Sequence, residues 1–311
     1  MARIHWHFNG TATVTLGGGT AAIDALGPWN AMNRVKVSAN SGTDIFSVSG
    51  YGSLLVDEVM ATPGRGYLTA EGGRATPLSI AAQVYAAAAA SGANTWDFGA
   101  TIPIAVNDQS ELGLVLLQNE LAAMSLGFEY NSSIYSTTGT VAPILVTGAA
   151  TATLTATIQP TIEYFAVPVD PKARPEIIWL HQILETLQPI ASVGDNTINL
   201  LRENVYLQIL HHVILNNAPN STDVDRIRMV LNTSDYPYDL LKRGALQLQR
   251  RRSSIDAPLG VYMFDLFNQG MSGYGSERDI VNGKATSEFQ DIITIASGAT
   301  LGTNASRVNT I

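Results

Sequence analysis

The sequence predicts an all-β protein made of two consecutive eight-stranded jelly rolls, a double jelly roll, with one short helix in each roll. Three observations lead to this prediction. Polar and apolar residues alternate with a period of two over much of the chain, and glycine-rich turns separate the alternating segments. The order helix, loop, strand also occurs twice, at 76–106 and at 236–267. Two similar β-rich halves in one chain argue against an enzyme.

The two copies are separated by a constant offset. Pro77 and Pro237 are each expected to begin a helix, and they lie 160 positions apart. Proline is favoured at the first helical position because its missing N–H would have no partner there. Ile102 and Tyr262, in the strands that follow, are separated by the same 160 positions. The predicted helices span 77–90 and 237–252.

Threonine-rich alternation predicts half-buried strands. Residues 11–16 and 151–158 alternate threonine with apolar residues or alanine. A period of two places successive side chains on opposite faces of a sheet, so one face is buried and the other is polar. Further strands are predicted at 34–39, 44–49, 53–59, 101–106, 112–118, 121–130, 141–146, 205–215, 226–231, 259–267, 286–296 and 307–311.

A proline-rich segment predicts the domain boundary. Pro168, Pro171 and Pro175 fall within eight residues, and such a segment is stiff and extended. We therefore expect an N-terminal jelly roll with an N-terminal arm at 1–166, a linker at 167–175 and a C-terminal jelly roll at 176–311. A seven-stranded immunoglobulin-like sandwich is the competing fold, but it does not predict a helix at the same place in both halves.

The composition excludes several classes of function. Charged residues make up 14% of the chain, against about 25% in a typical soluble domain. This indicates either a surface covered by other subunits or simply a β-rich protein with threonine-studded faces. The net charge is −8, and neither half is basic, so sequence-specific nucleic-acid binding is not expected. The chain has no cysteine, which excludes disulfides, thiolate metal sites and thiol nucleophiles.

The first residues are candidates for a docking arm. Arg3, His5, Trp6, His7 and Phe8 combine aromatic and basic side chains before the first long alternating strand. Two histidines two positions apart are potential metal ligands, but no third ligand is nearby in the sequence. We therefore expect an aromatic arm that docks on a partner, and no metal. The same segment lacks the apolar run of a signal peptide, so synthesis and assembly in a cytoplasm are expected.

Two other groups of ionisable residues stand out. Arg250, Arg251 and Arg252 end the second predicted helix, where they either form ordinary salt bridges or contact lipid headgroups, a genome or the acidic surface of a partner. His211 and His212 lie in an apolar strand and point to opposite faces, so we expect one to be buried and the other to lie at a surface or subunit contact. Without a serine or cysteine motif they do not predict catalysis.

Carboxylates are densest near the C-terminus, at Asp265, Glu277, Asp279, Glu288 and Asp291. Loops rich in aspartate can hold calcium, but the twelve-residue calcium loop is missing from the sequence. Solvated loop charges are the preferred interpretation. A structural calcium ion is therefore not supported, and no cofactor is expected.

Four stretches of the chain carry a resemblance to a known family. They are 27–37, which begins with Gly27-Pro28 and leads into a strand, 193–198, 260–266, and 278–281 together with 285–290. Together with the repeat, they resemble the double jelly-roll major capsid proteins of tailless icosahedral viruses, a lineage that includes membrane-containing bacteriophages and adenovirus. The resemblance implies a structural protein of the virion that forms homotrimers, and these pseudo-hexameric capsomers tile an icosahedral shell. It also implies contacts with minor capsid and penton proteins and with an internal lipid membrane, and it brings no catalytic residues.

A receptor-binding or carbohydrate-binding β-sandwich, such as a viral spike, is the alternative. Such a protein would show exposed aromatic residues beside aspartate or asparagine on loops. Trp6, Trp29, Trp96 and Trp179 are instead far apart in the sequence and mostly adjacent to strand starts. The tryptophans are therefore expected to anchor the core.

Overall fold

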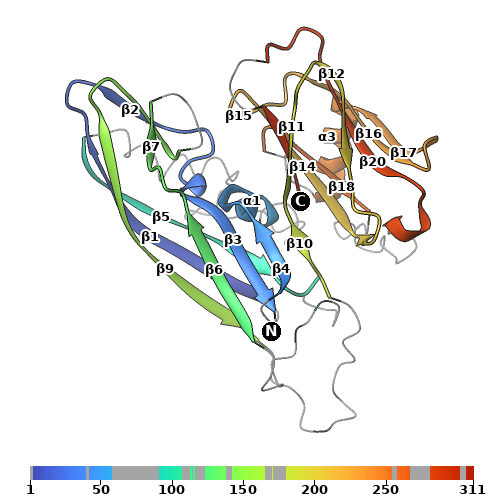
Figure 1. The fold of residues 1–311 in the computed structure, drawn as a ribbon, viewed down its shortest axis with the longest axis horizontal. Helices are drawn as coiled ribbons and strands as arrows, with labels where there is room; N and C mark the ends of the chain where they lie inside the picture. Colours follow the sequence, from blue (N-terminus) through green and yellow to red (C-terminus); the bar gives the residue numbers. More distant parts are fainter. Residues whose placement is uncertain are drawn as a thin grey trace. The chain divides into compact units, whose positions relative to one another are not determined.

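The computed structural model divides into two compact units (Figure 1). The first unit comprises the described residues through Glu185, and the second begins at Thr186. The structure describes residues 3–39, 42–57, 91–106, 113, 115, 123–137, 142–164, 170, 180–253, 258–266, 281–301 and 306–311. The predicted helix at 77–90 lies outside these residues, as does the predicted linker at 167–175 apart from Asp170.

Residues just before Thr186 belong to the first unit because of their strand pairing. Strand β10 (Ile183–Leu184) pairs in parallel with β4 (Thr43–Val48). The backbone N–H of Glu185 also donates to the carbonyl oxygen of Ser47 over 2.9 Å. The second unit therefore starts at Thr186, whereas the proline-rich segment of the sequence predicts a start at residue 176.

The second unit is a sandwich of two antiparallel sheets with jelly-roll connectivity. One sheet has the order β11-β21-β14-β15, with β18 also paired to β14, and the other has the order β12-β20-β16-β17. The chain crosses repeatedly between the sheets, so that β11, β14, β18 and β21 lie in one sheet and β12, β16, β17 and β20 lie in the other. Eight strands in this order have the connectivity of a jelly roll. The strands of the two sheets are β11 (Thr186–Pro189), β12 (Gly194–Asn199), β14 (Gln208–Leu215), β15 (Ala218–Pro219), β16 (Val224–Leu231), β17 (Asp235–Leu241), β18 (Val261–Asp265), β20 (Phe289–Ile295) and β21 (Arg307–Thr310). A separate small pair is formed by β13 (Val205–Tyr206) and β19 (Val281–Asn282), and the 3-10 turn η4 (Gly283–Ala285) follows β19.

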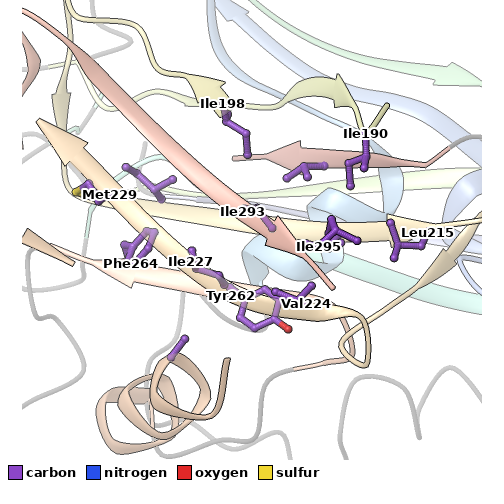
Figure 2. Close-up of a cluster of buried hydrophobic side chains, with 14 of the residues drawn as sticks. Ile190, Ile198, Leu215, Val224, Ile227, Met229, Tyr262, Phe264, Ile293 and Ile295 are labelled. Atoms are coloured by element: carbon purple, nitrogen blue, oxygen red, sulfur yellow. The ribbon is translucent and has the colours of Figure 1, made fainter. Parts of the chain in front are cut away.

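The core of this sandwich lies between the inward rows of the two sheets (Figure 2). Val213 of β14 faces Ile227 of β16 and Ile293 of β20 in one cluster, and all three side chains are fully buried. Each such side chain contributes about 1.5–3 kcal/mol to folding when it leaves water. The period-two pattern in the sequence thus predicts the correct inward residues of these strands.

The second predicted helix begins later than the sequence suggests. Helix α3 spans Lys242–Ser253, whereas residues from Pro237 to Leu241 belong to β17. The expectation of a helix start at Pro237 is wrong because Tyr238 and Leu240 pack against the core as alternate residues of a strand. Strand β17 lies at the edge of its sheet, where a proline can be accommodated without losing a bond of the ladder.

The first unit contains two larger sheets and one small one. The order β5-β1-β9 forms the first sheet, the order β10-β4-β3-β6 forms the second, and β2-β8-β7 is the small sheet. Their strands are β1 (Arg3–Thr15), β2 (Thr20–Ile23), β3 (Met32–Ala39), β5 (Gly92–Pro103), β6 (Met124–Tyr130), β7 (Tyr135–Ser136), β8 (Ile144–Thr147) and β9 (Thr151–Glu163). A 3-10 turn, η1 (Trp29–Ala31), precedes β3.

A short helix replaces the strand that the sequence predicts at 53–59. Helix α1 (Gly50–Leu55) begins after Ser49, whose hydroxyl accepts a hydrogen bond from the N–H of Gly52 over 3.0 Å. Glu185 in turn accepts hydrogen bonds from the backbone N–H and the hydroxyl of Ser49. This N-cap favours a helical turn over an extended strand, so the predicted strand is wrong over 53–57. Residues 58 and 59 lie outside the described residues.

Aromatic side chains fill the core of the first unit. The Trp6 ring lies edge-on to Trp29, Phe98 and Phe128, with ring centroids 5.9–6.0 Å apart. Phe8 stacks on Phe98 at 4.5 Å. Trp6, Trp29 and Trp96 are at most 4% exposed, so the expectation that they anchor the core is confirmed. Trp179 lies outside the described residues. None of the described helices is long and apolar enough to cross a membrane.

Candidate assembly surface

The expected N-terminal arm is instead part of a sheet. Residues from Arg3 to Phe8 form the first half of β1, which pairs along its length with β5 on one side and β9 on the other. Trp6 is 2% exposed and Phe8 is fully buried, and the indole N–H of Trp6 donates to the hydroxyl of Ser53 over 3.2 Å. The prediction of an aromatic docking arm is therefore wrong, because the aromatic residues are needed in the core.

The polar members of the same segment lie on the opposite face of β1. His5 lies 3.0 Å from a carboxylate oxygen of Glu163 and 3.0 Å from the hydroxyl of Thr101. Arg3 also pairs with Glu163, over 3.3 Å, while His7 pairs with Asp97. The two histidines thus contact different carboxylates. Within the residues that the structure describes, no three histidine or acidic side chains gather as metal ligands.

Beyond these pairs, the outward face of the first sheet is uncharged. We call this part the threonine face. It consists of Thr11, Thr13 and Thr15 of β1, Ala93 and Thr95 of β5, and Thr151, Thr153, Thr155 and Thr157 of β9, all of them exposed. Thr11 lies opposite both Thr95 and Thr155 in the register, so hydroxyl and methyl groups form straight rows across the strands. In Figure 1 the three strands run side by side in the first unit.

His211 forms a buried polar link between the two sheets of the second unit. Its Nε2 lies 2.8 Å from Oδ2 of Asp291 in the opposite sheet, and its Nδ1 lies 3.0 Å from the hydroxyl of Thr310. Burial raises the pKa of the Asp291 carboxyl, and the hydrogen bond with His211 offsets part of that rise. The order carboxylate, imidazole, hydroxyl is that of a nucleophilic triad. All three residues are buried, however, so the link joins the sheets and is closed to a substrate.

His212 is buried as well, at 1% exposure. Burial lowers the pKa of its imidazole to about 3, and the positive charge of Arg307 adds to this effect. The expectation that one histidine of the pair lies at a surface is therefore wrong. A sequence pattern shows that neighbouring strand residues face opposite ways, but it cannot show whether both faces are covered.

The three arginines fall in the last turn of α3, as the sequence predicts. The side chains of Arg250, Arg251 and Arg252 lie outside the described part of the structure, so their contact with an anionic partner stays a prediction.

The acidic group near the C-terminus does not form a site in the described residues. Asp265 and Asp291 are buried on separate strands, and Glu277 and Asp279 lie outside the described part.

Sequence reasoning missed a charged ladder on the outward face of the second unit. Arg226 forms a two-pronged pair with Asp239, and Arg228 pairs with Asp195. A hydrogen bond from the hydroxyl of Thr294 and then the bond from Arg228 hold the pKa of the Asp195 carboxyl below its usual value. The alternation of these arginines with apolar residues in β16 is the signal that predicts an outward charged row.

The fold places the chain in a defined structural class. No protein-family model and no curated protein matches the sequence. Several solved structures do match. The chain is similar to the STIV major capsid protein, with 12% identity and a TM-score of 0.60, and the match covers 100% of this chain and 86% of the STIV chain. The PBCV-1 virus capsid matches over 99% of this chain and 84% of the other, with 12% identity and a TM-score of 0.61. A second structure, of Sulfolobus turreted icosahedral virus, matches 99% of this chain and 80% of the other, with 12% identity and a TM-score of 0.55.

These matches run through both units. The chain therefore has the double jelly-roll fold, and the fold class predicted from the sequence is confirmed.

Proposed function

We propose that this protein is the structural major capsid protein of an icosahedral virus and that it forms pseudo-hexameric trimers which tile the shell. The observation that carries this proposal is the double jelly roll over the full chain. The STIV major capsid protein and the PBCV-1 virus capsid share this fold, and each alignment covers 99% or more of this chain. The low content of charged residues supports it too, because closed assemblies bury much of each subunit's surface.

The doubled fold supplies a physical reason for a trimer. Three copies of a chain with two similar sandwiches place six sandwiches around one axis. Such a ring has a nearly hexagonal outline, which tiles a surface, while the closed three-fold symmetry stops the trimer from growing further. The halves differ in charge, with a net of −6 for residues 1–166 and −2 for residues 167–311, so the ring would alternate in charge.

The alternative function, a carbohydrate-binding spike, has less support. Sugar-binding sites use exposed aromatic rings, and Trp6, Trp29 and Trp96 are buried. The exposed aromatic residues in the described part of the chain are tyrosines: Tyr130, Tyr135, Tyr164 and Tyr236. A catalytic role is also unsupported in the described residues. His211 and Asp291 are closed off in the core, and His5 and His7 are paired with carboxylates on an open, flat face.

The partners follow from the same proposal. Copies of this chain form the trimer and the neighbouring capsomers, and minor capsid and penton proteins fill the remaining positions of the shell in the virion. An internal lipid membrane is the proposed partner of Arg250, Arg251 and Arg252.

Assembly of the purified protein tests the proposal. Light scattering coupled to size exclusion should give a mass three times the 33.1 kDa of the chain, and negative-stain electron microscopy should show six-lobed particles. A monomer at micromolar concentration would overturn the proposal. Binding of that monomer to a glycan array would favour the spike function instead.

A further inference from the structure

We propose that strand β9 pairs along its free edge with β9 of a second copy of this chain, so that one antiparallel sheet continues from copy to copy. The inference rests on the proposed capsid function for the place of this contact, which lies between neighbouring trimers. Pairing of two identical strands has two-fold symmetry, and two-fold contacts between three-fold trimers extend them into a shell. The edge of a sheet offers a row of unpaired N–H and C=O groups, which an added strand satisfies.

Strand β9 differs from the other edge strands in the described part of the chain. Proteins protect such edges by keeping them short or by placing charges, prolines or bulges on them. The other described edge strands of six or more residues, β5, β6, β12 and β17, each contain an aspartate or glutamate and a glycine or proline. From Thr151 to Gln159, β9 contains none of these, and its register with β1 is regular. This stretch therefore has nothing that keeps another strand away.

The inner side of β9 is only partly covered by the described residues. Ala12 and Phe8 of β1 are fully buried. Leu154 and Ile158, which lie opposite them on β9, stay partly exposed. A strand added along β9 would cover these two apolar side chains and would pair the backbone in the same step.

The pairing of β9 with β1 shows which partner strand β9 accepts. Residues 11–15 of β1 are Thr-Ala-Thr-Val-Thr, and residues 151–155 of β9 are Thr-Ala-Thr-Leu-Thr. In their antiparallel ladder threonine lies opposite threonine, and alanine lies opposite valine or leucine. A second copy of β9 presents the same alternation to the free edge. The strand is therefore complementary to itself, and this identifies the second copy as its partner.

The register of the pairing follows from Pro160. A proline has no N–H to donate, so the new ladder ends before it and uses residues 151–159. Antiparallel pairing about the centre of this stretch places Thr155 opposite its own copy and Thr153 opposite Thr157. Threonine then meets threonine on the outer face, and each alanine meets a leucine or isoleucine on the inner face. The contact is held by a backbone ladder about 31 Å long rather than by a large apolar area, and a shell repeats it in every subunit.

Disulfide cross-linking tests this register, because the natural chain has no cysteine. Thr155→Cys would place two thiols opposite each other, with Cα atoms about 4.5–5.5 Å apart, which a disulfide can span. Thr151→Cys is the matched control, since Thr151 is an exposed threonine of the same strand. Its two copies would lie about 27 Å apart, at about 3.4 Å per residue. Assembled particles of each variant are oxidised with copper phenanthroline and separated on non-reducing gels.

We expect Thr155→Cys to yield at least about tenfold more cross-linked dimer than Thr151→Cys, because a disulfide needs Cα atoms within about 7 Å. Thr153→Cys and Thr157→Cys should not cross-link alone and should cross-link when mixed. Equal yields from Thr155→Cys and Thr151→Cys would overturn the inference. Hydrogen exchange of dissociated subunits provides a further check. If the amides of 151–159 that point away from β1 are already protected there, another part of the same chain covers the edge and the inference fails.

The failure of this inference and that of the capsid function can be told apart. If the unmodified protein forms trimers and Thr155→Cys does not cross-link, the strand pairing is wrong and the capsid function stands. If Thr155→Cys cross-links but light scattering shows no trimer, the strand pairing stands and the capsid function fails.

Charge substitution at the two-fold position provides an independent measurement. In Thr155→Lys two lysines would face each other across the new ladder, which should weaken assembly by about fivefold. Thr155→Glu should have the same effect, and a mixture of the two variants should recover assembly. Thr13→Lys is the control, because Thr13 lies on the same threonine face but on the central strand β1. Circular dichroism checks that each variant folds. Normal assembly of Thr155→Lys would contradict the inference.

Discussion

The link between His211 and Asp291 makes a strong prediction about the stability of the second unit. The two side chains are fully buried and 2.8 Å apart, and they come from opposite sheets. Replacing one partner alone, by His211→Leu or Asp291→Leu, leaves the other as a buried polar group without its main hydrogen bond. Each single substitution should therefore lower the free energy of unfolding by about 3–5 kcal/mol.

The double variant separates this reasoning from simple damage to the core. When both residues become leucine, no ionisable group remains in the link, and the loss should be smaller than the sum of the single losses by at least about 2 kcal/mol. Thr310→Val is a milder control, because it removes only the hydrogen bond at 3.0 Å from Nδ1 and should cost about 1 kcal/mol.

The tryptophans allow each unit to be followed separately. Residues from Thr186 onwards contain no tryptophan, and Trp6, Trp29 and Trp96 lie in the first unit. Urea unfolding at one fixed protein concentration should show an earlier transition by circular dichroism in the single variants, with the fluorescence transition unmoved. Losses that add within about 0.5 kcal/mol in the double variant would refute the coupling across the core.

Three further predictions concern other parts of the chain. The pKa of the His212 imidazole is about 3 in the folded protein and 6.5 in the unfolded chain. The stability that this difference provides is fully present above pH 6.5, where the imidazole is neutral in both states. It is lost as the pH falls toward 3, by about 5 kcal/mol in total, because the unfolded chain takes up the proton first. His212→Gln should remove this part of the acid sensitivity, and an unchanged dependence of the urea midpoint on pH would contradict the assignment. Gly50→Ala should destabilise the first unit by about 1–3 kcal/mol in tryptophan-monitored unfolding, because the new Cβ would overlap the backbone oxygen of Trp29. Gly127→Ala, with open space around its Cβ position, is the control and should be close to neutral. Replacing Arg250–Arg252 by serine should weaken sedimentation with anionic vesicles by about 1 kcal/mol per arginine and leave the subunit folded, whereas equal sedimentation would exclude the membrane contact.

Alternation in the sequence predicts strands well where burial follows a local pattern. Residues 11–15 of the predicted strand at 11–16 fall in β1, residues 226–231 fall in β16, and the inward residues of β16 are those that the pattern predicts. The start of α3 is missed because Pro237 is compatible both with a helix start and with an edge strand. Only the packing of Tyr238 and Leu240 against the core decides between the two.

The functional surface is harder to predict, because it depends on pairings that are distant in sequence. Trp6 resembles an exposed aromatic in a terminal arm until β5 and β9 are placed on both sides of it. His211 gains its role from Asp291, which is 80 positions away. The charge-free rows exist only because β1 and β9 pair in the register that aligns their threonines, and no local window of sequence contains that information.

The central position of β1 also has a consequence for how the protein is made. Thr15 pairs with Thr151, which follows it by 136 positions. At about 5–20 residues per second, a ribosome needs on the order of 10 s to synthesise the strand that completes the second side of β1. Until then the strand that carries Trp6 and Phe8 has an open edge, and pairings over such separations are slow to form. The nascent chain therefore passes through a stage at which it can associate with other chains, and a chaperone that binds apolar segments is expected to raise the yield of folded protein.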